Sequence, residues 1–194
     1  DSWATTGAPI PPEDLPQPKD MPKVGAANLW VIAGKPDSMG LYRLEQLVAE
    51  IVQNSLWLAD SYFVATTGYV RALTGASQAG IDVRLLVPSS SDMPLVQAIS
   101  RSAYRPLLEC GVRVFEWDGP MMHAKTAVAD GIWSRVGSSN SNLASWVTNR
   151  ELDVTVHDAA FAAEMETMYE RDLDNSTEVV LEAGRVRPIK RRMR

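Results

Sequence analysis

The stretch from His123 to Asn140 reads HAKTAVADGIWSRVGSSN and joins two apolar segments through an Asp-Gly pair. An Asp-Gly pair between two apolar segments is typical of a tight turn between antiparallel strands. The stretch therefore predicts a β-hairpin with strands over residues 123–129 and 132–139. Residues 152–157 alternate apolar and polar side chains, which predicts a third strand soon after the hairpin.

Pairs of polar residues stand at the ends of these three predicted strands. Side chains two positions apart on a strand point to the same face. The pairs with this spacing are His123 with Lys125, Ser138 with Asn140, and Asn149 with Glu151. If the three strands are neighbours in one sheet, a single pocket holds a nucleophile, a cation, hydrogen-bonding groups and a carboxylate. Such a pocket suits a phosphate diester.

The rest of the chain alternates strand and helix patterns. The predicted strands cover residues 29–33, 56–62, 81–87 and 112–117, and the predicted helices lie around residues 44–51, 69–80, 94–109 and 161–169. This alternation predicts an α/β sandwich with a mixed central sheet flanked by helices.

Two of the predicted helices carry more detailed expectations. In the first, Leu44, Leu47, Val48 and Ile51 follow the i, i+3, i+4, i+7 spacing of a buried face. In the third, Ser91 or Asp92 is the expected N-cap, and Pro106 is the expected site of a kink.

Composition divides the chain into three parts. With 194 residues and 45% apolar content, the chain is long enough for one domain of ordinary size. Residues 1–27 hold six of the twelve prolines and predict a linker or extended strap. Residues 28–175 form the predicted lobe, and residues 176–194 form a basic C-terminal tail.

Charge is distributed unevenly between these parts. The last ten residues carry six cations and no acid, so a net charge of −5 leaves −11 for residues 1–184. The tail is expected either to be solvated or to bind an anionic membrane surface or nucleic acid. The acidic body makes nucleic acid a less favoured partner. No apolar run approaches the roughly 20 residues that a membrane-spanning helix needs.

The chain resembles the phospholipase D superfamily in the motif H-x-K-x4-D-x6-G-S-x-N, which is followed by N-x-E. The resemblance extends from the DVRLLVP strand to NRELDV. Over this wider stretch the chain is most similar to the C-terminal half of bacterial cardiolipin synthases. This resemblance implies a phospholipase D-like α/β lobe. It also implies a phosphodiesterase or phosphatidyltransferase that acts on phospholipids through a phosphohistidine intermediate. No metal or other cofactor is expected, because lysine supplies the positive charge.

The resemblance also implies a role for each residue of the motif. His123 is either the nucleophile or the acid that protonates the leaving alcohol. Lys125 and Asn140 are expected to bind the phosphate oxygens, with Ser138 assisting them. The carboxylate partner of the histidine ring is expected to be Glu151. The catalytic motif also includes Asp130, for which its position beside the turn favours a structural role.

The family's active site needs two such motifs, and this chain has one. The second motif is expected from an N-terminal half that precedes Asp1 or from the mate in a homodimer. The alternatives are a metal-independent nuclease acting as a homodimer and a noncatalytic phosphate-binding lobe. Where many cardiolipin synthases carry an Arg-Ser pair, this chain has Ala144 and Ser145, so the acceptor, water or an alcohol, stays open. The implied location is cytoplasmic or peripheral to a membrane, with any anchor outside this chain.

Overall fold

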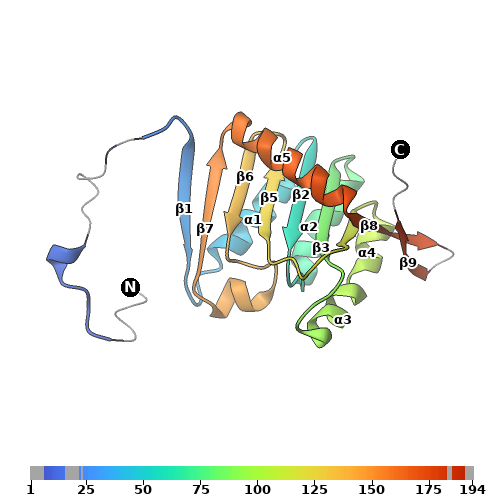
Figure 1. Cartoon of the computed structure of the whole chain (residues 1–194), viewed down its shortest axis with the longest axis horizontal. Coiled ribbons are helices and arrows are strands. Elements are labelled where there is room, and N and C mark those ends of the chain that lie inside the picture. Colours follow the sequence, from blue (N-terminus) through green and yellow to red (C-terminus); the bar gives the residue numbers. More distant parts are fainter. Residues whose placement is uncertain (1–6, 16–21, 23, 183–184, 191–194) are drawn as a thin grey trace.

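A computed structural model describes residues 7–15, 22, 24–182 and 185–190 of the chain. Within these residues, nine strands form one sheet in the order β1-β7-β6-β5-β2-β3-β4-β8-β9 (Figure 1). The strands are β1 (Asn28–Gly34), β2 (Ser55–Asp60), β3 (Asp82–Pro88), β4 (Arg113–Trp117), β5 (Lys125–Ala129), β6 (Trp133–Gly137), β7 (Glu151–His157), β8 (Ser176–Glu182) and β9 (Arg185–Lys190). The helices are α1 (Gly40–Ile51), α2 (Thr67–Gln78), α3 (Pro94–Ser102), α4 (Tyr104–Glu109) and α5 (Ala159–Asp174), with a 3-10 turn at η2 (Pro12–Asp14) and a π-helical turn at η4 (Ala144–Thr148).

The sheet is mixed, as the alternation of strands and helices predicted. Strands β2, β3 and β4 run parallel to one another, whereas β5 pairs antiparallel with β2. Strands β5 and β6 form the predicted hairpin, and β7 lies antiparallel beside β6. The three strands with polar ends are therefore neighbours. Because they alternate in direction, the start of β5, the end of β6 and the start of β7 meet at one edge of the sheet.

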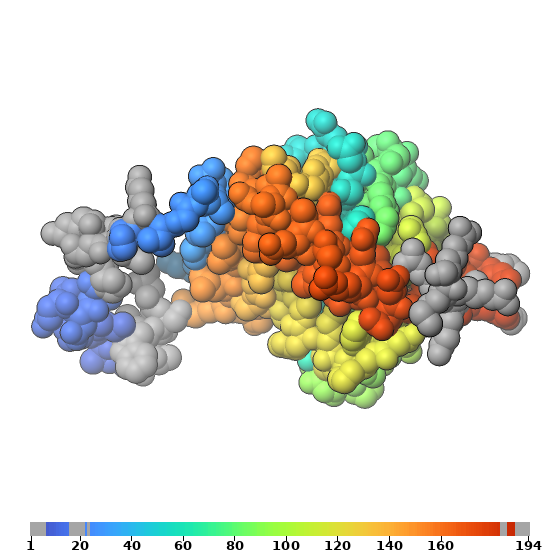
Figure 2. All heavy atoms as spheres, turned by 45° about the horizontal axis from the view of Figure 1, so that its top comes forward, coloured from blue at the N-terminus to red at the C-terminus, as the bar shows by residue number. Residues whose placement is uncertain are grey.

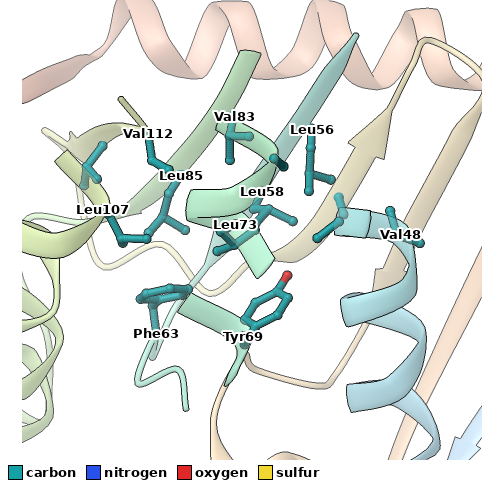
Figure 3. Close-up of a cluster of buried hydrophobic side chains, with 14 of the residues drawn as sticks. Val48, Leu56, Leu58, Phe63, Tyr69, Leu73, Val83, Leu85, Leu107 and Val112 are labelled. Atoms are coloured by element: carbon teal, nitrogen blue, oxygen red, sulfur yellow. The ribbon is translucent and has the colours of Figure 1, made fainter. Parts of the chain in front are cut away.

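Helices cover both faces of the sheet. On one face, α1, α2 and α4 enclose the larger core, which includes Val48, Leu56, Leu58, Tyr69, Leu73 and Leu85 (Figure 3). On the other face, α5 runs across the surface and packs over β6, β5, β4 and β8 (Figure 2). Its core side buries Met165 and Tyr169 against Trp57, Leu86 and Phe115 of the sheet. Among the described residues, no helix is both long and apolar enough to cross a bilayer.

The buried face of α1 differs from the predicted one. The helix buries Leu41, Glu45 and Val48, whereas Leu47 and Ile51 face solvent. Of the four predicted residues, Val48 is buried and Leu44 packs partly buried against the core, so the prediction is wrong for Leu47 and Ile51 only. The buried Glu45 carboxylate lies 3.1 Å from a buried arginine, which compensates its charge inside the protein.

The predicted helix over residues 94–109 is two helices, α3 and α4, separated at Ala103. The break comes before the expected kink at Pro106 because a proline ring clashes with the carbonyl four residues earlier. Neither proposed side chain caps α3, whose N-cap residue is Met93. The hydroxyl of Ser91 accepts a hydrogen bond from the Met93 N–H at 3.0 Å. The carboxylate of Asp92 accepts a hydrogen bond from the Tyr62 hydroxyl.

The sheet continues into the segment that the sequence assigned to a C-terminal tail. Strand β8 pairs antiparallel with β4 and buries Val179, and β9 pairs with β8. The boundary predicted after residue 175 is therefore wrong for residues 176–182 and 185–190, which belong to the sheet. The basic residues 191–194 lie outside the described part of the chain, so the expected membrane contact of the tail stays a prediction.

One part of the sheet is left uncovered by α5. Strand β1 lies beyond the helix (Figure 1), and the face that β1, β7 and β6 share on the α5 side is apolar. The exposed residues of this apolar sheet face are Leu29, Val31, Val136 and Leu152. The surface reaches the edge where the polar strand ends meet, because the Ser138 N–H donates to the Leu152 carbonyl at 3.0 Å.

Candidate active site

The end of β2 joins the three polar strand ends. In the antiparallel pairing of β2 with β5, Asp60 lies opposite Lys125. The residues that follow Asp60, Ser61 and Tyr62, therefore enter the same pocket as His123. Sequence analysis had assigned these three residues to a strand without a function.

Lys125 is the first residue of β5 and is buried. Its Nζ donates hydrogen bonds to Ser61 Oγ at 2.9 Å and to the His123 carbonyl at 3.3 Å, and it lies 5.7 Å from the centre of the Tyr62 ring. Burial lowers the pKa of the ammonium, and the charges of Asp60 and Glu151 oppose this shift. Among the described residues, no carboxylate forms an ion pair with Lys125. Its positive charge is available to an anion.

His123 precedes β5 instead of forming its first residue, in contrast to the predicted strand. Its side chain is exposed and packs edge-to-face against Tyr62, with 6.0 Å between the ring centres. Residues 121–124 have no regular secondary structure, and the exposed His123 ring and the Lys125 ammonium both lie near the ring of Tyr62. An accessible imidazole and an unpaired ammonium are the groups that attack on a phosphate requires.

Glu151 is held by two neighbours. Ser138 Oγ donates to Glu151 Oε2 at 2.5 Å, and Asn149 Nδ2 donates to Oε1 at 3.1 Å. In the part of the chain that the structure describes, no hydrogen bond joins Glu151 to the His123 ring. The expected carboxylate–histidine contact is therefore not formed here, and that role of Glu151 stays a prediction.

Asn140 lies in the loop between β6 and η4. Its backbone N–H donates to Ser145 Oγ at 3.1 Å, which fixes the loop, while its side-chain oxygen is buried without a hydrogen-bond partner among the described residues. The next residue in the loop, Ser141, is fixed by Asp60. The Asp60 carboxylate accepts hydrogen bonds from the N–H groups of Ser141 at 2.5 Å and Tyr62 at 2.8 Å. Asp60 thus joins both sides of the pocket, and burial raises its pKa.

A buried charge cluster lies behind the loop. Arg135 Nη1 lies 3.1 Å from Glu45 Oε1 and 3.1 Å from Asp153 Oδ1, and it donates to the Ser139 carbonyl at 3.3 Å. Ser139 Oγ also donates a short hydrogen bond to Asp153. Burial raises the pKa of Glu45 to about 7 although Arg135 opposes the shift. Sequence analysis missed this cluster because an arginine on a strand and a glutamate on a helix ordinarily face solvent.

Asp130 lies at the opposite end of β5 from Lys125. Its carboxylate accepts backbone hydrogen bonds from Gln53 at 2.9 Å, Asn54 at 2.7 Å and Ser55 at 3.0 Å. Burial alone raises the pKa of Asp130, but these N–H groups outweigh it and the net pKa is lowered. Asp130 has positive φ at the hairpin turn, a conformation that aspartate tolerates better than most residues. These contacts support the structural role and tie the hairpin to the start of β2.

Comparisons with known proteins identify the family of this chain. The family described as "Cardiolipin synthase, PLD-like domain" matches residues 47–173. Cardiolipin synthase A of Proteus mirabilis is 31% identical over 186 residues, which covers 92% of this chain and 38% of the relative. Cardiolipin synthase 2 of Bacillus anthracis is 29% identical over 193 residues, covering 98% of this chain and 37% of the relative. The chain thus spans less than two fifths of the length of these relatives.

Among solved structures, the phospholipase D family member Nuc from Salmonella typhimurium has the same fold. It superposes with a TM-score of 0.70 over 79% of this chain and 99% of Nuc, at 17% sequence identity. The family match covers strands β2 to β7, the histidine motif and the loop between β6 and β7. The chain belongs to the PLD-like domain family of the cardiolipin synthases.

Proposed function

We propose that this lobe supplies half of the active site of an enzyme that transfers or hydrolyses the phosphodiester of a phospholipid. The observation that carries the proposal is the position of His123. Its accessible ring packs against Tyr62, whose ring also lies near the buried, unpaired ammonium of Lys125, at the edge where Ser138 and Asn140 also lie. The similarity to cardiolipin synthases favours a phospholipid as the diester.

The proposed reaction has two steps that use two histidines. In the first, a ring nitrogen of one histidine forms a bond to phosphorus, the bond from phosphorus to the leaving alcohol oxygen breaks, and the second histidine protonates that oxygen. In the second step, water or an alcohol attacks phosphorus, the bond to the histidine breaks, and the second histidine takes the proton. His123 performs one of these two roles.

The neighbouring side chains stabilise the charge that develops on the phosphoryl oxygens. Lys125 donates its remaining hydrogen to a nonbridging oxygen, and the amide of Asn140 binds another. Ser138 is held at the same edge by its hydrogen bond to Glu151. Because Lys125 is buried and has no carboxylate partner among the described residues, its charge acts on the phosphate at low effective dielectric.

A second lobe with its own histidine completes the proposed site. The relatives are more than twice as long as the matched region, which leaves room for another lobe of this size. The apolar sheet face of Leu29, Val31, Val136 and Leu152 is a surface that such a lobe can cover. In a homodimer, a second copy of this chain takes the same place.

The test is His123→Asn in the complete enzyme, with turnover of phosphatidylglycerol vesicles measured as both transfer and hydrolysis. Turnover is expected to fall by about 10³-fold or more. The matched control is His157→Asn, because His157 is also exposed but lies at the far end of β7 from Glu151. Turnover by the His123→Asn enzyme equal to that of the control contradicts the proposal.

The assay also distinguishes the other readings of the site. The chain is separated by size-exclusion chromatography, and light scattering gives the mass of each fraction. Each fraction is then assayed on phospholipid and on single-stranded DNA. Phospholipid turnover is expected only in species that contain two histidine motifs. Cleavage of DNA alone assigns the site to a nuclease, and phosphate binding without turnover in the complete protein assigns it to a binding module.

A further inference from the structure

Helix α3 lies at the same edge of the sheet as the candidate site (Figure 1). Its outer face exposes apolar side chains to solvent. Leu95 is 75% exposed and Ile99, one turn later, is 45% exposed, while Met93 just before the helix is 50% exposed. Ala98 and Ser102 lie on the same stripe of the helix. A surface helix ordinarily turns charged residues outward and apolar residues inward, so α3 has the reverse arrangement.

Gln97 and Arg101 of α3 form hydrogen bonds with the body of the protein, and Ser102 is the polar residue on the outer stripe. Arg101 is the one charged residue of this fully described helix, and it pairs with Glu116 at 2.8 Å. Arg101 also donates to the Ser89 carbonyl at 3.2 Å, and Gln97 donates to the same oxygen at 2.6 Å. These contacts fix the rotation of the helix. The uncharged outer stripe is therefore set by the hydrogen bonds on its inner side.

A short series of contacts joins α3 to the candidate site. The Tyr62 hydroxyl donates to Asp92 Oδ1 at 2.8 Å, just before the helix begins. The ring of the same tyrosine packs against His123 and lies near the ammonium of Lys125. The start of α3 and the phosphate-binding groups are therefore positioned by one side chain.

Another exposed apolar residue, Leu143, follows a residue that binds the backbone of Tyr62. Leu143 is 56% exposed at the start of η4, and the neighbouring Asn142 Nδ2 donates to the Tyr62 carbonyl at 3.0 Å. Exposed apolar residues thus lie on two segments, at α3 and at the start of η4, that are each joined to Tyr62 by a hydrogen bond of the adjacent residue. We call Met93, Leu95, Ile99 and Leu143 the apolar rim.

We infer that the apolar rim inserts into the hydrocarbon boundary of a lipid bilayer and places the pocket at the depth of the phospholipid headgroups. The inference rests on the proposed function, because a diacyl substrate keeps its chains in the bilayer while its phosphate reaches Lys125. Apolar side chains that leave water for the acyl region stabilise such contact. The outer stripe of α3 carries no charge, so this contact does not depend on anionic lipid.

The experiment measures binding of the 194-residue chain to sedimenting vesicles of phosphatidylcholine, with and without phosphatidylglycerol. The test variant is Leu95→Gln/Ile99→Gln. The matched control is Leu47→Gln/Ile51→Gln, an i, i+4 Leu/Ile pair on α1 with exposures of 51% and 62%. The control pair lies toward the end of α1 that leads into β2, away from the catalytic edge.

The rim variant is expected to bind both kinds of vesicle about tenfold more weakly than the unchanged chain, because two apolar side chains no longer insert. The control variant is expected to bind like the unchanged chain. Unfolding midpoints of both variants are measured first, and equal midpoints show that the substitutions act on binding and not on folding.

A second measurement locates the contact directly. A fluorescent label is placed at Leu95→Cys, or at Ile51→Cys as the control, in a Cys110→Ser background that removes the native thiol. Lipids brominated along the acyl chain are expected to quench the label at position 95 and not the label at position 51. Quenching depends on proximity to the chains, so it reports insertion and not adsorption to headgroups.

Three results overturn the inference: equal vesicle binding by the rim and control variants, no quenching at position 95, or a lower solution mass of the rim variant. The last result assigns the rim to a protein interface. Vesicle binding is measured without turnover, so its result does not depend on the outcome of the His123→Asn test. Conversely, phospholipid turnover that depends on His123, with no rim effect on binding, preserves the proposed function and rejects the rim.

Discussion

At the residue scale, the candidate site depends on a few side chains that the motif does not include. Asp60 joins the two walls of the pocket through the N–H groups of Tyr62 and Ser141. Asp153 binds the hydroxyl of Ser139, between the two expected phosphate-binding residues. Buried charge-assisted hydrogen bonds of this kind hold backbone geometry more firmly than neutral ones. Asp60 and Asp153 therefore fix the backbone of the loop that carries Ser138 and Asn140.

Gly137→Ala is expected to destabilise the protein by about 2 to 3 kcal/mol, because a Cβ at this position lies 2.8 Å from the Cα of Asp153 and overlaps its carboxylate. The backbone of β6 and β7 must separate, which also moves Ser138. Urea unfolding measures the cost.

The control for this prediction is Gly75→Ala in α2. A Cβ at Gly75 meets nothing within 4 Å, and alanine favours a helix over glycine by about 0.8 to 1 kcal/mol. The control variant is expected to be at least as stable as the unchanged protein. Equal unfolding free energies for Gly137→Ala and the unchanged protein contradict the close packing of β6 against β7.

At the element scale, strands and helices contribute differently to the site. Strands β5, β6 and β7 bring residues that are distant in sequence to one edge, because adjacent antiparallel strands alternate their ends. Helix α3 contributes no group to the candidate catalytic pocket but carries the apolar rim beside it. Strands β8 and β9 contribute to stability, since they cover the edge of β4 that otherwise presents unpaired backbone groups.

Truncation of the chain after residue 175 is expected to lower the unfolding free energy by at least about 3 kcal/mol, because it exposes the edge of β4 and removes the buried side chain of Val179. The freed edge is also expected to promote aggregation. Thermal unfolding and light scattering measure the two effects.

The matched variant for the truncation is Glu178→Gln. It removes the ion pair between Arg113 and Glu178, 2.8 Å long and partly exposed, but retains the strand. Its expected cost is at most about 1 kcal/mol. If the truncated chain is as stable as this variant, β8 is not an integral strand of the sheet.

At the scale of the whole molecule, the buried cluster of Glu45, Arg135 and Asp153 couples stability to pH. Burial raises the pKa of Glu45 from 4.5 to about 7. Between these values the folded protein binds more protons than the unfolded chain, so the contribution of Glu45 to stability is full below about pH 4.5 and is lost as pH rises toward 7.

Glu45→Gln is expected to flatten the stability profile, because glutamine has no proton to lose. Between pH 4.5 and 7.5 the unchanged protein is expected to lose on the order of 2 to 3 kcal/mol relative to this variant. Urea unfolding at a series of pH values measures both proteins. The control is Glu50→Gln, an exposed residue of the same helix. If the unfolding free energies of the unchanged protein and of Glu45→Gln change equally with pH, the pKa of Glu45 is not raised in the folded protein.

The sequence by itself determined the alternation of strands and helices, the hairpin at Asp130, and the residue types of the site, because these depend on local periodicity and fixed spacing. The tertiary structure alone decided the buried face of α1, the break before Pro106 and the sheet position of residues 176–182 and 185–190. It also revealed Asp60, Glu45 and Arg135 as buried groups. Local pattern treats a charged residue as solvent-facing, and only the folded chain shows that an opposite charge from a distant element compensates its burial.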